Sequence, residues 1–269
     1  GRGELEFSYL ERNTSISHLY QQQPIKIMFP NVARGEVKQA VITNTAGGLV
    51  GGDNLSLSVV GKCGTSALIL SQSAEKVYGS VNEVSTIKID ITAKEKTWLE
   101  YLPQETILFD GSRLDRKTKI TAHNGARILA GEIIVFGRRG SGEKFSSGFL
   151  RDTWEVRDQQ KLVWTDTLLL ENNIKQILEH PACFDNMSAT ATIVLICEHS
   201  VDYLEYSRSL LQNHDVTIRA GVSVINGVLV IRLLGSEPLD LRRAFSTVWQ
   251  NLRYHIANLP YMMPRLWQI

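Results

Sequence analysis

Short runs that alternate between apolar and polar residues dominate the sequence, and they restrict the fold more than any other feature. In residues 85–92 the three isoleucines fall on one face and Lys88 and Asp90 on the other, as expected for a half-buried strand. Comparable runs occupy residues 37–43, 55–60, 66–70, 97–101, 106–109, 118–121, 133–136, 161–170, 189–197 and 222–234. Turn residues separate them at intervals of about 8–14 residues, without helical periods between them, which argues against βαβ units. We therefore predict one mainly β domain over residues 1–269, built of stacked or antiparallel strands.

The last third of the chain contains two segments with a helical period. Residues 239–256 repeat apolar side chains at the i, i+3, i+4 and i+7 positions of one helix face. Ser236 and Pro238 stand where an N-cap and a first-turn proline are expected. Residues 201–211 show an incomplete apolar face and predict a second helix. The Asn-Gly pair at 226–227 lies between two apolar runs and predicts a β-hairpin.

The composition argues against several classes of partner. Because 29 Lys and Arg nearly balance 28 Asp and Glu, the chain lacks the basic excess of proteins that bind nucleic acid through bulk charge. Its longest apolar stretch, residues 189–197, is less than half of the roughly twenty residues that a membrane-spanning helix needs. No signal-peptide core is seen near the N-terminus. Three widely spaced cysteines favour a reducing compartment, so we expect a cytoplasmic protein.

A glycine-rich segment, TAGGLVGGD at residues 45–53, places four glycines within six positions. Such a segment can adopt positive φ angles and approach other backbones closely. It lacks the Gly-Lys-Ser/Thr ending of a phosphate loop, and the strand that follows it argues against a dinucleotide fingerprint. Two interpretations remain: a tight double turn between strands, or a rigid turn that holds Asp53 as a polar ligand or pore-lining group.

The residues that could carry chemistry are mainly carboxylates. None of the six histidines forms an HxH, HxxxH or HExxH motif, which argues against a locally encoded zinc site. No Gly-x-Ser-x-Gly nucleophile elbow is present. Acidic residues at strand ends beside glycines usually solvate turns, but a set facing one interior would suit Ni²⁺ or Mg²⁺ through oxygen ligands. The candidates of this kind are Glu105, Asp110, Glu132 and Glu143.

Four segments, taken together, resemble the UreD family of urease accessory proteins, called UreH in some organisms. They are residues 44–53, 73–78 and 102–111, and the segment from Gly131-Glu132-Ile133 to Gly142-Glu143. The order, the spacing and a terminal Pro-Arg-Leu-Trp at 264–267 also fit, so that the resemblance covers nearly the whole chain. One departure is Gly79, where the family pattern leads us to expect Arg.

The resemblance implies a scaffold without independent catalysis. It implies that the chain binds UreF, which recruits the GTPase UreG, and that the assembly docks on apo-urease to deliver nickel. Ni²⁺ would pass through an internal tunnel, with no tightly bound cofactor, because a site with four soft ligands would trap the ion. The tunnel-side acids implied by position are Asp53, Glu132 and Asp166, followed by Glu75, Glu105 and Asp110.

Two of these acids carry sharper expectations. The turn geometry should fix the backbone of Asp53 and leave its carboxylate free to face a channel. Glu132 precedes an apolar run, which would place it at the rim of the core. Because a buried, unpaired carboxylate is costly, both should face water or a cation.

Two other classes of function compete with the scaffold. A metal-dependent hydrolase would use the same acids as ligands but needs a water-activating site that the sequence does not display. A β-sandwich binding module would use exposed aromatic side chains, whereas the five tryptophans lie mostly in apolar patterns.

The chain after the last helix predicts a partner-binding surface. Apolar residues gather there around two prolines, and an exposed apolar patch is typical of a protein that works within a complex. The residues of this predicted surface are Leu259, Tyr261, Met262, Met263 and Trp267.

Overall fold

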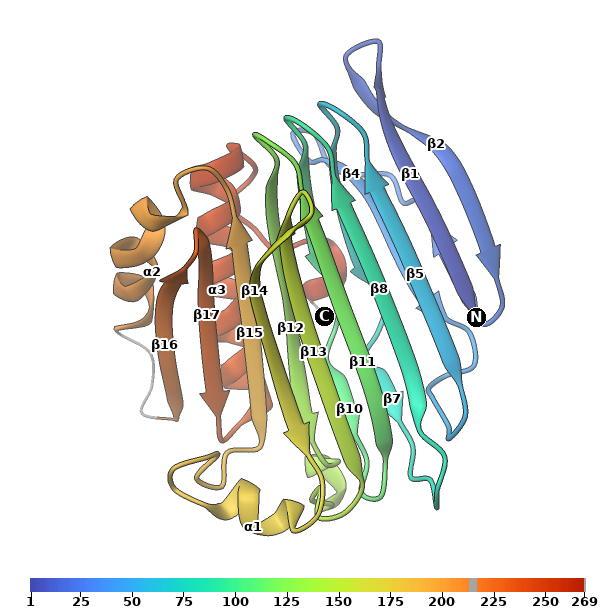
Figure 1. Cartoon of the computed structure of the whole chain (residues 1–269), viewed down its shortest axis with the longest axis vertical. Coiled ribbons are helices and arrows are strands. Elements are labelled where there is room, and N and C mark those ends of the chain that lie inside the picture. The colour runs from blue at the N-terminus through green and yellow to red at the C-terminus, as the bar shows by residue number, and fades with distance from the viewer. Residues whose placement is uncertain (213–216, 269) are drawn as a thin grey trace.

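The computed structural model describes residues 1–212 and 217–268, which form two stacked β-sheets with the longest described helix on one outer face (Figure 1). Sheet A has seven strands in the order β14-β13-β11-β8-β5-β1-β2. Their bounds are β1 (Arg2–Leu10), β2 (Asn13–Gln22), β5 (Asn54–Gly61), β8 (Ser85–Ala93), β11 (Arg113–Ala122), β13 (Phe149–Asp158) and β14 (Lys161–Leu170).

Sheet B has ten strands, of which eight follow the order β16-β17-β15-β12-β9-β6-β4-β3 while β10 and β7 extend from β12. Their bounds are β3 (Ile25–Met28), β4 (Lys38–Asn44), β6 (Ser66–Ser71), β7 (Glu75–Val77), β9 (Trp98–Leu102), β10 (Thr106–Leu108), β12 (Arg127–Phe136), β15 (Ala189–Ile196), β16 (Ile218–Ile225) and β17 (Val228–Gly235). The predicted mainly β fold is confirmed.

Strand pairing is parallel in the middle of both sheets and antiparallel at their ends. From β4 to β13 the chain passes repeatedly from one sheet to the other, so β5, β8, β11 and β13 pair in parallel in sheet A. The strands β4, β6, β9 and β12 do the same in sheet B. Parallel neighbours need a crossover, which is usually a helix. Here a strand of the opposite sheet makes the crossover, and this explains why no βαβ pattern is visible in the sequence.

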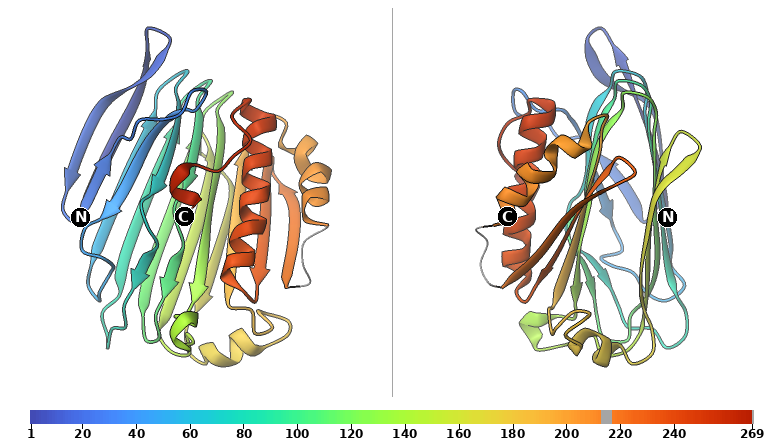
Figure 2. Two further views of the ribbon diagram at one scale, coloured as in Figure 1. Left: turned by 180° about the vertical axis from the view of Figure 1, so that it is seen from behind. Right: turned by 60° about the vertical axis from the view of Figure 1, so that its left-hand side comes forward.

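Three α-helices are described: α1 (Ile174–Glu179), α2 (Leu204–Leu211) and α3 (Pro238–Ala257). Figure 2 shows α3 lying along the outer face of sheet B. Its predicted apolar face is buried, and Pro238 occupies the first turn as expected, but the N-cap is Glu237 and not Ser236. The second predicted helix is also present, although its first residues, Ser200–Tyr203, form a 3₁₀ turn. The short α1 was not predicted.

The chain has two apolar cores, one on each side of sheet B. Sheet A and sheet B enclose the first, and sheet B and α3 enclose the second. On β12 the side chains of Ile128 and Ile134 belong to the first core, whereas Leu129 and Ile133 belong to the second. Because both faces are covered, the strand reads as a continuous apolar run. Glu132 interrupts that run on the face that points between the sheets.

Two local predictions are explained by backbone geometry. Asn226 and Gly227 both have positive φ, as a two-residue hairpin of the primed type requires, and they join β16 to β17. The glycine-rich segment is the predicted turn between β4 and β5. Its Gly48 could carry no side chain, because a Cβ would lie 2.7 Å from the Lys76 carbonyl oxygen. Among the described helices, none is long and apolar enough to cross a membrane.

Candidate functional site

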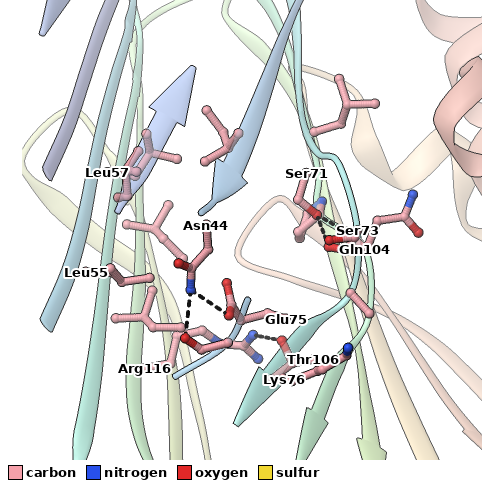
Figure 3. Close-up of a pocket in the computed structure, with 18 of the residues that line it drawn as sticks. Asn44, Leu55, Leu57, Ser71, Ser73, Glu75, Lys76, Gln104, Thr106 and Arg116 are labelled. Carbon is pink, nitrogen blue, oxygen red and sulfur yellow. Dashed lines mark hydrogen bonds between the residues drawn. The ribbon is translucent and has the colours of Figure 1, made fainter. Parts of the chain in front are cut away.

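A cavity of about 320 Å³ lies between the two sheets on the side of β5 and β8 (Figure 3). Sheet A contributes an apolar wall that includes Leu55 and Leu57. Sheet B and its extension contribute polar side chains, among them Asn44, Glu75 and Thr106. The first cavity reaches the surface where lining residues such as Gly47 and Lys76 are exposed.

A second cavity, of about 470 Å³, lies between the same sheets on the side of β13 and β14. Its inner wall contains Glu132 and Asp152, which come from opposite sheets. Its outer part contains Asp166 and Arg232, and it opens between the edge strands, where lining residues such as Gly221 are exposed.

Arg116 lies where the two cavities approach one another. Its side chain lines the first cavity, and the two carboxylates that it contacts line the second. Arg116 Nε donates to Asp152 Oδ1 at 2.7 Å, and Nη1 donates to Thr106 Oγ1 at 2.9 Å. Nη2 forms an ion pair with Glu132 that lacks hydrogen-bond geometry. We call Arg116, Glu132 and Asp152 the junction cluster; at most 5% of each side chain is exposed.

The strand register explains why these residues meet. Arg116 and Asp152 are direct neighbours in the parallel pair β11–β13, so they lie side by side on the inner face of sheet A. Glu132 reaches them from β12 in sheet B. Trp154, two residues along β13 from Asp152, donates from its Nε1 to Glu132 Oε1 at 2.6 Å. The cluster therefore bridges the two sheets through side chains of three strands.

One guanidinium faces two carboxyl groups in the junction cluster, and the pKa values of Glu132 and Asp152 shift in opposite directions. Burial raises the pKa of Glu132 well above its usual range, and the charge of Asp152 adds to this against the effect of Arg116. Burial also disfavours ionised Asp152, but Arg116 and the hydrogen bonds outweigh it and lower the pKa of Asp152. Burial opposes the charge of Arg116, yet the two acids raise its pKa, so it stays protonated. Glu132 therefore holds a proton more readily than an ordinary carboxyl group does, while Asp152 and Arg116 stay charged.

Glu75 is the acid of the first cavity. Burial raises its pKa to about 7, the charge of Asp53 adds to the rise, and a hydrogen bond from Asn44 opposes it. Asn44 Nδ2 donates to Glu75 Oε1 at 2.9 Å. Glu75 therefore changes charge near neutral pH, inside a mostly apolar space.

Three of the four segments that carry the family resemblance surround the first cavity. Asn44, Gly48, Glu75 and Gln104 all line it. The fourth segment supplies Glu132 to the junction cluster. A sequence profile of the UreD urease accessory proteins matches residues 1–268. The chain belongs to the UreD family.

Relatives of this UreD chain cover nearly its whole length. The urease accessory protein UreD of Magnetococcus marinus is 37% identical over 273 residues, which is 100% of this chain and 94% of that protein. The UreD of Paracoccus denitrificans is 35% identical over 254 residues, covering 94% of this chain and 88% of that protein. UreD 1 of Brucella abortus is 32% identical over 269 residues, covering 100% and 94%. Membership in this family assigns the chain a role in urease maturation.

The structure separates the six acids that the UreD resemblance singled out. Glu132 and Asp166 both line the second cavity, and Glu75 lines the first. Glu132 lies in the middle of β12 and is fully enclosed, so the expectation of a position at the rim of the core was wrong. The strand is longer than its apolar run suggested because Arg127 already belongs to it.

The other acids hold local structure. Asp53 Oδ2 accepts a hydrogen bond from the Val50 N–H at 2.9 Å, so its carboxylate closes its own turn. The expectation that this carboxylate is free to face a channel was wrong. Glu105 forms an ion pair with Arg242 of α3. Asp110 Oδ1 accepts two backbone N–H groups, those of Ser146 and Ser147. Burial opposes ionisation of Asp110, but these hydrogen bonds outweigh it and lower its pKa.

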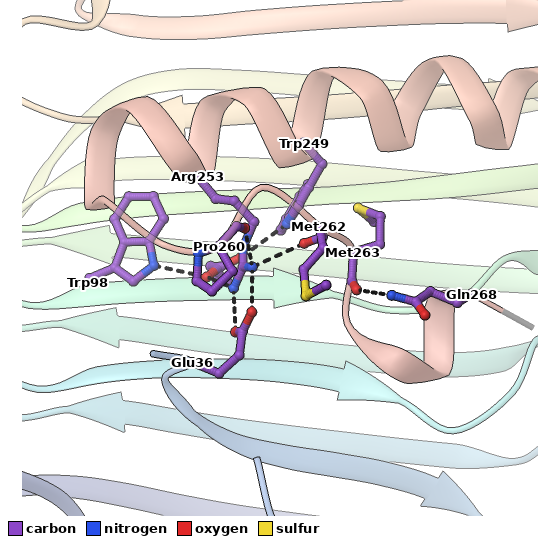
Figure 4. A network of polar contacts seen from close by, with 9 residues as sticks. Glu36, Trp98, Trp249, Arg253, Pro260, Met262, Met263 and Gln268 are labelled. Carbon is purple, nitrogen blue, oxygen red and sulfur yellow. Dashed lines mark hydrogen bonds and ion pairs between the residues drawn. The ribbon is translucent and has the colours of Figure 1, made fainter. Parts of the chain in front are cut away.

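The predicted partner surface is largely buried in the chain itself. Leu259, Met263 and Trp267 are only 7%, 7% and 4% exposed and belong to the core beneath α3. The interpretation of these three as an exposed patch was wrong. Tyr261 and Met262 remain exposed. As Figure 4 shows, Arg253 of α3 holds this segment by donating to the carbonyl oxygens of Pro260 and Met262.

Sequence reasoning missed Arg116, Asp152 and Trp154. The strand β13 was not predicted, which removed Asp152 and Trp154 from consideration. A usable signal was present in β11, whose inward positions are Leu114, Arg116, Thr118 and Ile120. A charged residue at an inward position of an alternating strand points to a buried polar partner. Within residues 1–212 and 217–268, no three His, Cys, Asp or Glu side chains are placed to hold a metal ion.

Proposed function

We propose that this chain matures urease as a non-catalytic scaffold that conducts Ni²⁺ between the two sheets. In this proposal it binds UreF, and through UreF the GTPase UreG, and docks on apo-urease. Nickel enters one cavity, crosses the junction cluster and leaves through the other. The observation that carries the proposal is the pair of buried carboxylates, Glu132 and Asp152, shared by only one arginine between two cavities.

The chemistry of the junction suits an ion in transit. Glu132 and Asp152 offer carboxylate oxygens, which bind Ni²⁺ less firmly than a set of thiolates and imidazoles would. Conduction requires binding that is favourable enough for entry and weak enough for exit. Two carboxylates and water meet that requirement, because they supply charge without a closed coordination shell. No tightly bound cofactor is needed for this role.

The direct test removes one carboxyl group from the junction cluster while preserving its shape. Glu132→Gln keeps the hydrogen bond from Trp154 and leaves Arg116 paired with Asp152. We expect urease matured with this variant to contain severalfold less nickel and to be correspondingly less active. Co-purification with UreF should be unchanged, because Glu132 lies inside the chain.

A matched control is available on the same sheet. Asp115 is the outward-facing neighbour of Arg116 on β11 and forms a surface ion pair with Arg151. Asp115→Asn also removes one carboxylate charge, but outside the route, and should leave nickel loading unchanged. Normal nickel loading with Glu132→Gln would refute the proposed route, and an equal loss with Asp115→Asn would show that overall charge is responsible.

A further inference from the structure

Glu75 is a mostly buried acid with no cation paired to it. Its Oε1 accepts the hydrogen bond from Asn44 Nδ2, whereas its Oε2 has no hydrogen bond or ion pair among residues 1–212 and 217–268. Lys76 and Arg116 line the same cavity, but neither forms an ion pair with Glu75. Figure 3 shows the carboxyl group facing the space between the two sheets. One carboxyl oxygen is therefore available to a group that enters the first cavity.

The glycine-rich turn and a neighbouring strand fix the position of this carboxyl group. Asn44 Oδ1 accepts a hydrogen bond from the Ala46 N–H at 3.0 Å, and Nδ2 also donates to the Gly48 carbonyl oxygen at 3.2 Å. These two contacts orient the amide so that a donor faces Glu75. The backbone N–H of Glu75 donates to the Glu105 carbonyl oxygen at 2.8 Å. Because the acid is already held in place, a ligand that binds it has less ordering to bring about.

The wall that sheet A contributes to this cavity is apolar. Leu55, Leu57 and Ile89 line it and are at most 8% exposed. A cavity of roughly 150 Å³ is enough to hold benzene inside a protein. The first cavity has about 320 Å³, so it has room for a short alkyl chain beside the acid.

These surroundings discriminate between kinds of cation. Among the residues that the structure describes, no three His, Cys, Asp or Glu side chains are placed to hold a metal ion. A small inorganic cation would exchange its water for apolar side chains, which is unfavourable. An ammonium group on an alkyl chain avoids this cost, because its N–H groups meet the carboxylate while its carbon chain leaves water.

We propose that the first cavity binds an alkylammonium group, which donates hydrogen bonds to Glu75 Oε2 while its carbon chain packs against the apolar wall of sheet A. The ligand is a free primary amine or the lysine side chain of a partner protein, since both present the same chemistry. This inference goes beyond the proposed function and does not rest on it, because no step of it involves nickel or the junction cluster.

The charges and protons of this binding balance. Ionised Glu75 and one ammonium group form a neutral pair, and no covalent bond changes. Burial raises the pKa of Glu75 to about 7, so below that pH the acid must release its proton before it binds. The charge of Asp53 also acts on Glu75, and Lys76 is exposed at the opening. Arg116 stays protonated, and burial raises the pKa of Tyr101, so neither changes charge near neutral pH. Affinity should therefore increase as the pH rises through 7.

Calorimetric titration of the purified full chain tests the site with n-butylammonium as the probe. We expect saturable binding at about pH 8 when ionic strength is held constant. The uncharged n-butanol and the chain-free ammonium ion should each bind at least about tenfold more weakly, since each lacks one half of the interaction. Equal affinity for n-butanol would overturn the role of the carboxylate, and no saturable binding of n-butylammonium would overturn the site.

Glu75→Gln removes the charge and preserves the shape of the site. The amide oxygen of the variant can still accept the hydrogen bond from Asn44. We expect the affinity for n-butylammonium to fall by about tenfold or more, the usual effect of losing a hydrogen bond to a charged group. The increase with pH should also disappear. Unchanged affinity with Glu75→Gln would overturn the proposal.

Glu83→Gln is the matched control. Glu83 is exposed and lies against the glycine-rich turn, but it does not line the cavity. This variant loses the same charge near the same end of the molecule and should bind n-butylammonium as the unmodified chain does. An equal loss of affinity with Glu83→Gln and Glu75→Gln would show that overall negative charge attracts the probe, and would overturn the site.

A second probe distinguishes the two sources of the ammonium group. Nα-acetyl-lysine amide presents a lysine side chain on a blocked backbone. If it binds with the same dependence on Glu75, the cavity can take a lysine of a partner protein; if only n-butylammonium binds, the ligand is a free amine. Either result supports the site. Normal nickel loading with Glu132→Gln would refute the conduction route and leave this site standing, whereas failure of n-butylammonium to bind would refute the site and leave the route.

Discussion

Two buried arginines, each between two carboxylates, lie on opposite faces of sheet B and differ in how completely they are bonded. Arg253 of α3 makes six hydrogen bonds, to Glu36, Glu100 and the carbonyl oxygens of Pro260 and Met262. Arg116 makes two, to Asp152 and Thr106. The same residue types therefore form a fully hydrogen-bonded cluster around Arg253 and an incompletely hydrogen-bonded cluster around Arg116.

The surroundings account for this difference. Glu100 is completely buried and also accepts hydrogen bonds from the indoles of Trp98 and Trp249, so its charge has a full set of donors. Arg116 instead borders a cavity, and its acids border another. The hydrogen-bonding capacity of Arg253 is used, whereas Nη2 of Arg116 has no hydrogen bond among the described residues. The comparison predicts a larger loss of stability on removing Arg253 than on substituting the acids that line the cavities.

The largest expected effect comes from removing Arg253. Arg253→Leu leaves Glu36 and Glu100 without their cation and releases the segment at Pro260 and Met262, so the free energy of unfolding should fall by about 3–5 kcal/mol. Chemical denaturation measures this change. Arg243→Leu, on the exposed face of the same helix, is the control and should have little effect. If Arg253→Leu lowered the free energy of unfolding by less than about 1 kcal/mol, the Arg253 cluster would not stabilise the fold as its complete hydrogen bonding implies.

An intermediate effect is expected from the pH dependence of Glu75. Its pKa is about 7 in the folded chain against an ordinary value of 4.5, so folding disfavours its ionised form. Below pH 4.5 Glu75 is protonated in both the folded and the unfolded chain, and folding carries no penalty for its charge. As the pH rises through 7, the folded chain must bury the ionised acid, and its free energy of unfolding falls. The full shift corresponds to roughly 3 kcal/mol at about 1.4 kcal/mol per pH unit.

Glu75→Gln should remove this dependence. Denaturation curves at about pH 5 and about pH 8 should show a loss of stability for the unmodified chain that the variant does not share. If stability depended on pH in the same way for both proteins, the first cavity would not disfavour the ionised form of Glu75. The difference between this cavity and the fully bonded Arg253 cluster would then be smaller than proposed.

The smallest effect is expected at the outer end of the second cavity. Asp166 pairs with Arg232, and 38% and 49% of their side chains are exposed, so Asp166→Asn should change the free energy of unfolding by less than about 1 kcal/mol. Because this acid lies in solvent, nickel loading of urease should fall less than with Glu132→Gln. If Asp166→Asn reduced nickel loading more than Glu132→Gln, the outer end of the second cavity, and not the junction cluster, would limit the route.

Local sequence was sufficient where a pattern repeats within one element. The alternation in residues 85–92 specified β8 and its buried face, and the apolar period of residues 239–256 specified α3. The same reasoning missed β2, because most of its side chains are exposed and no apolar alternation marks it. It missed β13 although its inward residues alternate, since one of them is the charged Asp152.

The family was also recognisable from the sequence, because its segments keep their order along the chain whatever the fold. The meeting of Arg116, Glu132 and Asp152 was not, because it depends on the register between parallel strands and on the stacking of two sheets. Neither is encoded in any one segment. The burial of Met263 and Trp267 was likewise decided by packing. Apolar residues beside prolines are equally compatible with an exposed patch and with a buried segment. Here Arg253 binds the backbone carbonyl groups of this segment and holds it against the chain. Local periodicity determined which side chains face inward, and only the tertiary structure determined which of them face one another, since contacts between distant strands follow from the assembly of both sheets.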